Sequence, residues 1–379
     1  MNILHITPTY YPATYWGGPI YSVYGLCNAL ARMPDVKLRV LTTDAAGPAR
    51  SSSVKVTSFP MHYSAGYEVY FLSRWWGHSI SPGMLLRLWP MIRWADIVHL
   101  TAVYSPPTIP TLLMCHLLAK PVVWSPRGAL QRWEGATRPL AKRAWEWICN
   151  ALISRKSCIL HVTSEQEAKE SRARISNAEA ALIPNGINVP VALPARSWLP
   201  DGKLRLLYIG RLHPKKGIEN LLQALKLLGD ESISLMIYGS GDDTYVMGLR
   251  RLVHELNLDL IVSLPGHVDG EERMNAFMQS DVCVVPSFTE NFAMTVAEAL
   301  AHGVPVIASK GTPWAELEQH DCGVWVDNAP ESLAETISSI RNKALHEMGA
   351  RGRVWMSEQY DGTAIAAKML SVYNTLLRM

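Results

Sequence analysis

Apolar residues gather in short continuous runs along the first half of the chain, and a segment of helical spacing follows the first run. Continuously apolar runs are typical of strands that are buried on both faces of a parallel sheet. In residues 20–32 the apolar side chains recur every three or four positions, which predicts a helix. The predicted strands of this half are 2–7, 36–42, 69–72, 97–100, 121–125 and 159–163.

The same opening of strand, turn, helix and strand begins again at residue 204. The strand 204–209 leads through Gly210-Arg211 into a predicted helix at 218–228. Two successive units of this kind predict an α/β protein with two Rossmann-like, doubly wound domains. The predicted strands of the second half are 204–209, 234–238, 261–264, 282–286, 304–309 and 323–326.

A proline-rich segment separates the two series of strands and contains Pro190, Pro194 and Pro200. This composition is typical of a connector between domains. We therefore predict an N-terminal domain at 1–187, a linker at 188–203 and a C-terminal domain at 204–360. Helical spacing of apolar residues predicts one more helix within 361–379.

The composition supports a globular protein with two domains. A chain of 379 residues is too long for one ordinary core, and 48% apolar with 18% charged residues is not the composition of a disordered chain. The net charge of +3 does not by itself indicate nucleic-acid binding. The six cysteines are scattered without a C-x-x-C motif, which indicates buried thiols in a reducing compartment. Neither a signal peptide nor an uncharged apolar run of about 20 residues is visible, so we expect a cytoplasmic protein.

Two glutamates, Glu290 and Glu298, stand on either side of a predicted helix start. They stand eight positions apart, and eight helical residues would span roughly 12 Å, about the reach from the ribose to the sugar of a nucleotide-diphospho-sugar. A helix N-terminus between the glutamates would bind the diphosphate. One carboxylate would then accept hydrogen bonds from the sugar and the other from the ribose. The alternative is a pair of solvated glutamates near a helix start.

These residues resemble the E-x7-E signature of retaining GT-B glycosyltransferases in glycosyltransferase family 4. That family has Glu-x-Phe-Gly followed by Glu-Ala-x-Ala-x-Gly-x-Pro-Val. The chain reads Glu290-Asn-Phe-Ala and then Glu298-Ala-Leu-Ala-His-Gly-Val-Pro-Val, so Ala293 replaces the usual glycine. The resemblance covers essentially the whole chain. It implies two domains that face each other across a cleft, and a C-terminal helix that crosses back onto the N-terminal domain.

Arg211 and Lys216 follow the strand 204–209 in a loop that leads into a helix. An arginine can grip phosphate oxygens with two parallel hydrogen bonds, and a lysine supplies a point charge. The family has an arginine and a lysine at this spacing. The resemblance therefore implies that both stabilise the nucleoside diphosphate as it leaves. The alternative is a basic loop without a ligand.

The resemblance extends the donor site to two turns and to the residues around Glu290. Gly239 begins the turn Gly239-Ser-Gly241, for which a simple turn is the alternative. His267 and Val268 resemble the segment whose backbone meets the nucleobase. The predicted donor-binding residues are Gly17, Gly18, Arg211, Lys216, Gly239, His267, Val268, Glu290, Asn291, Phe292, Ala293, Met294, Thr295 and Glu298.

The N-terminal half contributes three further features to the predicted site. Gly17-Gly18 precedes the first helix and resembles the glycine loop that faces the diphosphate. His99 and Arg127 lie at the ends of predicted strands, where doubly wound sheets bind ligands, although a strand-end histidine is also often structural. Many relatives have a histidine near the position of Arg127. Arginine does not act as a general base, so we predict a contact with the donor sugar or the acceptor. The predicted catalytic residues are Glu290, Arg211, Lys216, His99 and Arg127.

Metal-binding motifs are absent from the sequence. It contains no D-x-D triplet, no H-E-x-x-H and no cysteine cluster. We therefore expect no metal and no cofactor, with the nucleotide-sugar as a co-substrate and with cationic side chains taking the part of a metal.

Tryptophan and basic residues are interleaved in the segments 74–94 and 131–156. Such a mixture suits a surface that contacts anionic lipid, and it also suits ordinary amphipathic helices that pack on the sheet. The lipid interpretation predicts a peripheral protein on the inner face of the cell membrane and a lipid-linked acceptor.

Together these features predict a retaining, metal-independent hexosyltransferase that acts by front-face substitution. The predicted donor is UDP-glucose or another UDP-hexose, and the acceptor is a saccharide or lipid-linked sugar in polysaccharide biosynthesis. A GDP-mannose-dependent mannosyltransferase is one alternative, and a GT-B epimerase is another. A Rossmann oxidoreductase is disfavoured because no G-x-G-x-x-G is present. A non-catalytic protein that binds nucleotide-sugars is the alternative of a different class.

Overall fold

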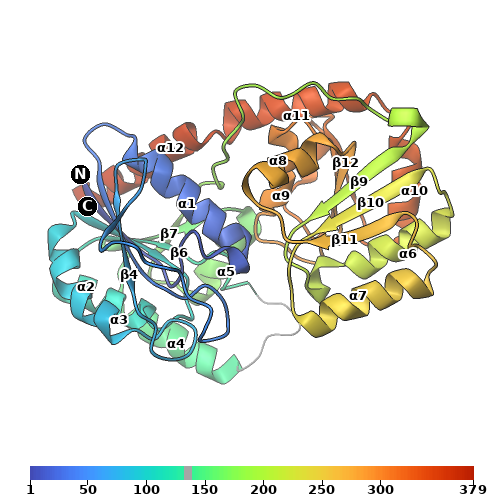
Figure 1. Ribbon diagram of the computed structural model, residues 1–379. Helices are drawn as coiled ribbons and strands as arrows, with labels where there is room; N and C mark the ends of the chain where they lie inside the picture. The colour runs from blue at the N-terminus through green and yellow to red at the C-terminus, as the bar shows by residue number, and fades with distance from the viewer. Residues whose placement is uncertain (132–138) are drawn as a thin grey trace. The chain divides into compact units, whose positions relative to one another are not determined.

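The computed structural model describes residues 1–131 and 139–379, which form two compact units (Figure 1). The first unit contains Met1–Gly186 together with Gly362–Met379. The second unit is the continuous stretch Ile187–Asp361. The first unit is thus made from two pieces of chain, with the second unit inserted between them.

The first unit is built on an eight-stranded sheet in which only the short edge strand β3 is antiparallel. The strands follow the order β3-β4-β2-β1-β5-β6-β7-β8. In sequence they are β1 (Asn2–Ile6), β2 (Lys37–Thr43), β3 (Met61–His62), β4 (Glu68–Leu72), β5 (Ile97–Thr101), β6 (Val122–Ser125), β7 (Cys158–Val162) and β8 (Glu179–Leu182). Its helices are α1 (Gly18–Ala31), α2 (Pro82–Trp94), α3 (Thr108–Leu117), α4 (Pro139–Leu152), α5 (Glu165–Arg174) and α12 (Gly362–Arg378).

Helices cover both faces of this sheet, which explains why its strands are continuously apolar. Leu4 and Ile6 of β1 point into a core formed with α2, α3 and α4. Ile3, from the opposite face of the same strand, belongs to the core formed with α1 and α12. Helices α1 and α12 pack together, as do α2 with α3 and α3 with α4 (Figure 1).

The second unit is built on a six-stranded, wholly parallel sheet with the order β11-β10-β9-β12-β13-β14. Its strands are β9 (Leu204–Ile209), β10 (Ile233–Tyr238), β11 (Val262–Gly266), β12 (Val282–Val285), β13 (Val306–Ser309) and β14 (Gly323–Val326). Its helices are α6 (Ile218–Leu228), α7 (Asp243–Glu255), α8 (Gly270–Met278), α9 (Met294–Ala301), α10 (Pro330–Ile340) and α11 (Leu345–Gln359). Two cores, one on each face of the sheet, hold these elements together.

Both sheets reverse their strand order at one point. If the parallel strands of each sheet are numbered along the chain, both sheets contain the order 3-2-1-4-5-6, which is that of dinucleotide-binding domains. The reversal lies between β1 and β5 in the first unit and between β9 and β12 in the second. Ligands of such sheets bind beyond the carboxyl ends of the strands at this point. The prediction of two Rossmann-like units is therefore confirmed.

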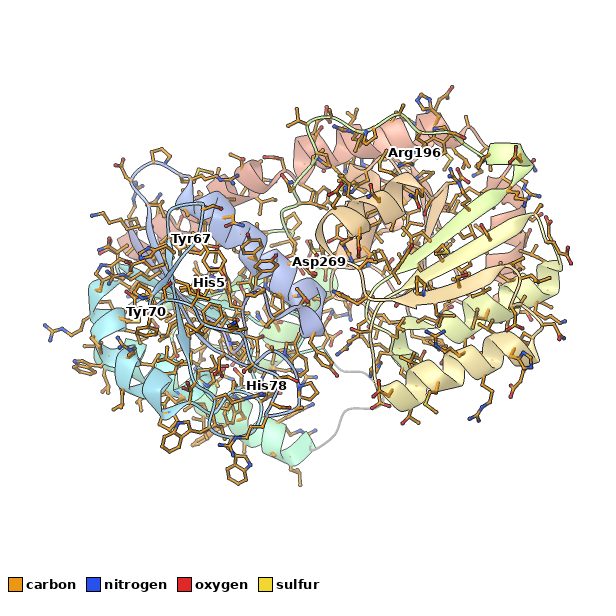
Figure 2. All side chains as sticks on the ribbon, viewed as in Figure 1. His5, Tyr67, Tyr70, His78, Arg196 and Asp269 are labelled. Atoms are coloured by element: carbon orange, nitrogen blue, oxygen red, sulfur yellow. The ribbon has the colours of Figure 1, made fainter. Side chains whose placement is uncertain are left out.

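The structure differs from the sequence prediction at the sheet edges and at the linker. Strands β3 (Met61–His62) and β8 (Glu179–Leu182) were not predicted. Strand β3 has only two residues, and β8 has four, of which one is a glutamate and two are alanines. The segment 188–203 belongs to the second unit. Arg196 in this segment donates hydrogen bonds to the carbonyl groups of Ser280, His302 and Gly303 (Figure 2).

All six cysteines are buried and unpaired. Among the residues that the structure describes, no helix is both long enough and apolar enough to span a membrane.

Close packing of α11 against the end of α9 makes Gly349 a sensitive position. A Cβ atom there would lie 2.0 Å from the carbonyl oxygen of Gly303. We predict that Gly349→Ala lowers the free energy of unfolding by at least about 3 kcal/mol, because a backbone group must move. Gly248 in α7 has open space around its Cα atom. Gly248→Ala should therefore raise the free energy of unfolding by about 1 kcal/mol. Denaturant titration of both variants tests this contrast.

Candidate functional site

The loops that follow β9 and β12 meet at the carboxyl edge of the second sheet. Gly210 and Arg211 leave β9, and the segment 286–293 connects β12 to α9. The hydroxyl of Thr295, in the first turn of α9, donates a hydrogen bond of 2.9 Å to the carbonyl of Ile209. This bond ties the start of α9 to the end of β9 and places the predicted donor residues at the reversal point of the sheet.

Two glycines allow the loops after β9, β10 and β12 to approach one another through their backbones. Gly217 has φ +63°, and a Cβ atom there would lie 2.2 Å from the carbonyl oxygen of Pro286. A Cβ atom at Gly239 would lie 1.8 Å from the carbonyl oxygen of Gly210. Packing therefore accounts for Gly239, and its predicted contact with the nucleotide stays a prediction.

Glu290 and Lys216 form an ion pair at this edge, with side chains that are only 12% and 17% exposed. The hydroxyl of Ser287 donates a 2.8 Å hydrogen bond to the same carboxylate oxygen, Oε1. Burial by itself would raise the pKa of Glu290, but the charge and hydrogen bond of Lys216, with Lys215 and Ser287, outweigh burial and lower that pKa. Glu290 is therefore an ionised acceptor. Among the described residues, Lys216 and Ser287 both contact Oε1, so the second oxygen, Oε2, can accept hydrogen bonds from a ligand.

Arg211 and the N-terminus of α9 supply positive potential beside the ion pair. Within the described ranges 1–131 and 139–379, no carboxylate pairs with the guanidinium of Arg211. Helix α9 has no side-chain hydrogen bond at its N-cap, Ala293. An arginine, a lysine and an uncapped helix N-terminus together form a site that suits a diphosphate.

Ala293 adopts φ +60° and ψ 68°, the left-handed conformation that glycine favours. For alanine this conformation costs roughly 1–2 kcal/mol. The preceding residue helps to hold it, because Phe292 packs its ring against Trp314 and accepts a hydrogen bond on its carbonyl from the Trp314 indole. Ala293 thus adopts a conformation that suits glycine, the usual residue of the motif at this position.

Glu298, in the middle of α9, is paired with Arg273 of α8. Sequence reasoning did not identify Arg273, because a single arginine in a helix carries no motif. The pair fixes the position of the Glu298 carboxylate. Each of the two signature glutamates thus has a cationic partner, Lys216 for Glu290 and Arg273 for Glu298. The predicted contact of Glu298 with ribose stays a prediction.

The other predicted donor residues lie along the same carboxyl edge. Asn291 and Met294 flank the start of α9, and both are half-buried. His267 is exposed and Val268 is half-buried, directly after β11. The second unit therefore brings the predicted residues to the ends of four neighbouring strands, β11, β10, β9 and β12, and to the helix α9 that follows β12. These residues are Arg211, Lys216, Gly239, His267, Val268, Glu290, Asn291, Phe292, Ala293, Met294, Thr295 and Glu298.

In the first unit, Gly17 and Gly18 lie where the loop after β1 enters α1. Gly17 has φ +69° and ψ −136°, and no atom would contact a Cβ there within 4 Å. Its backbone conformation, not crowding, therefore calls for glycine.

His99 lies inside the first sheet and is fully buried. Its Nδ1 atom lies 2.5 Å from the hydroxyl of Tyr373 in α12, and its Nε2 atom lies 2.7 Å from the hydroxyl of Ser125. Both ring nitrogens thus have protein partners. The placement is that of a structural histidine, which was the alternative in the sequence, and it gives no support to a direct contact between His99 and substrate.

His99 belongs to a series of hydrogen bonds between side chains, here called the histidine chain. The carbonyl group of Ile183 determines which atoms donate in it. His161 lies 3.0 Å from the carbonyl of Ile183 through Nε2, so this atom carries the proton. Burial lowers the pKa of His99 and of His161 well below the ordinary value, so both rings are neutral. The Nδ1 atom of His161 therefore accepts from Ser125 at 2.8 Å, Ser125 accepts from His99, and His99 accepts from Tyr373. His5 (Figure 2) stacks on His99 with ring centroids 4.5 Å apart.

Arg127 follows β6 and adopts φ +54°. One terminal nitrogen, Nη1, donates a hydrogen bond to Asn185, whereas Nε is buried without a partner in the described part of the chain. Burial lowers the pKa of Arg127 to about 10, against the opposing charge of Glu167, so the side chain is still a cation at neutral pH. Glu167, which sequence reasoning missed, is fully buried and accepts hydrogen bonds from the backbone of Gly128 and Thr163. The predicted role of Arg127 in sugar or acceptor binding stays a prediction.

The described residues contain no group of three or more His, Cys, Asp or Glu side chains placed to hold a metal ion. The expectation of a metal-independent reaction stays a prediction.

Two protein-family models match the chain in succession. The model "Glycosyltransferase Family 4" matches residues 16–190, and the model "Glycosyl transferases group 1" matches residues 193–355. The fold and the E-x7-E site define a glycosyltransferase of the GT-B class. The chain belongs to glycosyltransferase family 4.

The two relatives described next are each less than 30% identical to this chain. An uncharacterized glycosyltransferase of Methanocaldococcus jannaschii is 29% identical over 60% of this chain and 63% of its own length. A GDP-mannose-dependent alpha-(1-6)-phosphatidylinositol dimannoside mannosyltransferase of Mycobacterium tuberculosis is 25% identical over 46% of each chain. The matches thus span less than two thirds of these relatives. The crystal structure of the HepE protein of Anabaena in complex with UDP-glucose superposes with a TM-score of 0.75 at 16% identity, and covers 99% of this chain and 100% of the other. At that identity the structure shows a shared fold.

The ion pair of Glu290 makes stability depend on pH. We predict that Glu290→Gln lowers the free energy of unfolding by about 1–3 kcal/mol at pH 7, because Lys216 loses its counter-charge. The pKa of Glu290 is lowered in the folded protein. The contribution is therefore complete above the unfolded pKa of about 4.3 and is lost as the pH falls through the folded value. Denaturant titration from pH 7 downward should show the two proteins converging. Exposed Glu255→Gln is the control and should change little.

The direction of the histidine chain makes Tyr373 its first donor. Tyr373→Phe should lower the free energy of unfolding by about 1–3 kcal/mol, because the buried Nδ1 atom of His99 loses its partner. Asn374→Ala, at an exposed position of the same helix, should change it by less than about 0.5 kcal/mol. Equal effects of the two substitutions in denaturant titrations would contradict the assigned chain.

Proposed function

We propose that the chain is a retaining hexosyltransferase that uses a nucleotide-diphospho-sugar donor. The donor would be UDP-glucose or another UDP-hexose, and the acceptor a saccharide or lipid-linked sugar in polysaccharide biosynthesis at the inner face of the cell membrane. The observation that carries the proposal is the arrangement of Arg211, Lys216 and Glu290 at the reversal point of the second sheet. Membership of glycosyltransferase family 4 supports the reaction class.

The cationic groups suit the charge that develops during transfer. As the bond between sugar and phosphate breaks, the leaving nucleoside diphosphate gains negative charge. Arg211 and the N-terminus of α9 are available to that charge, and Lys216 neutralises it while still contacting Glu290. Fixed groups that are already oriented stabilise such charge more effectively than water does.

Glu290 suits a role in positioning the sugar. Its carboxylate is ionised and held by Lys216 and Ser287, which makes it a rigid acceptor for sugar hydroxyls. The same contacts lower its basicity and its reactivity as a nucleophile. We therefore propose front-face substitution, in which the acceptor oxygen bonds to the anomeric carbon on the face that the phosphate leaves. The departing phosphate oxygen takes the acceptor proton, and the anomeric configuration is retained.

GDP-mannose is the alternative donor, because one relative is named as a GDP-mannose-dependent mannosyltransferase, whereas the HepE structure contains UDP-glucose. The alternative of another class is a protein that binds nucleotide-sugars without turnover. Binding and turnover must therefore be measured separately.

The test begins with thermal unfolding in the presence of UDP, GDP, ADP and their sugars, with a chelator present. A nucleotide at a hundredfold excess over its Kd should stabilise the protein by about 2.7 kcal/mol. Transfer from the donor so identified is then followed by NMR at the anomeric carbon. An inverted product contradicts the mechanism, and binding without transfer to a panel of saccharide and lipid-linked acceptors supports the non-catalytic alternative.

Lys216→Ala provides the sharpest variant. We predict a loss of roughly hundredfold or more in kcat, because one stabilising charge is removed from the leaving group. Lys226→Ala, which removes an exposed lysine from α6 of the same unit, should leave kcat unchanged. The melting temperature of each variant is recorded so that loss of folding is distinguished from loss of activity.

A further inference from the structure

We propose that one face of the first unit docks onto an anionic phospholipid bilayer. This face, here called the tryptophan surface, consists of the turn 75–80 and the exposed sides of α2, α3 and α4. These three helices follow one another along one side of the unit (Figure 1). Its large apolar side chains that are more than 60% exposed are Trp75, Trp76, Leu86, Leu117, Leu140 and Trp147.

Helix α4 presents its apolar stripe outward. Leu140, Ala144, Trp147, Ile148 and Ala151 recur at helical spacing and are all exposed. They form the face of α4 that the fold does not cover.

The opposite face of α4 is buried and carries the one carboxylate of the helix. Glu146 accepts a hydrogen bond from Tyr104 and pairs with Arg174 at 3.2 Å. Cys149 lies in the core beside it. A helix that buries Glu146 and exposes Trp147 is oriented for an apolar environment outside the protein.

Helix α2 is apolar on both sides. Leu88 and Met91 lie in the core, whereas Leu85, Leu86 and Trp89 are exposed on the outer side. The turn before α2 carries Trp75 and Trp76, which are also exposed. Tryptophan is enriched where an apolar phase meets water, because its ring is apolar and its N–H group can stay hydrated.

The exposed charged side chains in the described part of this surface are all basic. In the described segments 69–95, 97–131 and 139–156, the only carboxylate is the buried Glu146. The exposed arginines and lysines of α2, α4 and the residues after α4 are Arg87, Arg93, Arg143, Arg155 and Lys156. Of these, Arg155 pairs with Glu179, and Arg87 lies over the ring of Phe59. The residues Arg132, Trp133, Glu134 and Arg138 of the predicted segment lie outside the described residues.

This combination favours a lipid surface over a second copy of the chain. A two-fold dimer through the tryptophan surface would bring Arg87, Arg93 and Arg143 against the same basic surface of the partner. The described part of that surface offers no exposed carboxylate to pair them. Anionic phospholipids instead supply negative headgroups for the arginines and an apolar boundary for the tryptophans. Docking rests on the membrane location given in the proposed function and names the surface for it. It does not depend on the donor reaction, so flotation and the transfer assay fail independently.

The experiment is flotation of the full chain with vesicles of phosphatidylcholine alone, and with vesicles of phosphatidylcholine and phosphatidylglycerol in equal parts. We expect the chain to float with the mixed vesicles, and high salt to weaken the binding. The double variant Leu140→Ser with Trp147→Ser should weaken binding at least about tenfold. Arg93→Gln with Arg143→Gln should weaken it about fivefold for each charge.

Matched controls come from the second unit. Leu260→Ser removes a side chain that is 91% exposed, and Arg251→Gln removes an exposed charge from α7. Both should bind mixed vesicles as the wild type does. Flotation with neither vesicle, or equal binding by wild type and the Leu140/Trp147 variant, would overturn the proposal. So would a dimer that light scattering detects in the wild type and that the Leu140/Trp147 variant loses, since a second copy would then be the occupant.

Discussion

Contact between backbones, without side chains in between, determines where the charged groups of the candidate site lie. Gly217 brings the loop after β9 against Pro286, and Gly239 brings the loop after β10 against Gly210. Lys216, next to Gly217, can reach Glu290 only because these loops lie this close together. The ion pair, the uncapped end of α9 and the position of Arg211 all follow from this constraint, because each is attached to one of the same loops.

Several carboxylates of the second unit are removed from water, and a cationic partner compensates for the hydration that each one loses. Glu290 is matched by Lys216, Glu298 by Arg273, and the buried Asp281 by Arg205. A carboxylate out of water is tolerated when a cation and further hydrogen bonds replace its hydration. Glu290 is thus held ionised and oriented, and Glu298 is oriented by its pair with Arg273. Both arrangements suit carboxylates that accept hydrogen bonds from sugar and ribose hydroxyls.

Much of the fold and the core of the candidate site were predictable from local sequence. The apolar runs gave the central strands to within a few residues, and the spacing of Glu290 and Glu298 gave the start of α9. What sequence reasoning missed depends on distant partners. The environment of His99 is set by Tyr373, 274 residues away, and Arg273 acquires its role only because α8 packs near α9. The left-handed backbone of Ala293 could likewise not be predicted from the residue type, because alanine rarely adopts this conformation.

The two-piece construction of the first unit has a consequence for how the protein forms in the cell. Tyr373 and its helix α12 complete the core of a unit whose other elements lie before Ile187. Domains generally fold as units while the ribosome extends the chain from its N-terminus. The second unit is continuous, so all of it emerges before α12 does. Met1–Gly186 therefore lacks α12 until the second unit has been synthesised. During that time Nδ1 of His99 lacks its donor Tyr373, and the part of the apolar core that α12 covers is exposed. We therefore expect nascent chains of this protein to need chaperones mainly for the first unit, because its N-terminal piece is synthesised long before its C-terminal helix.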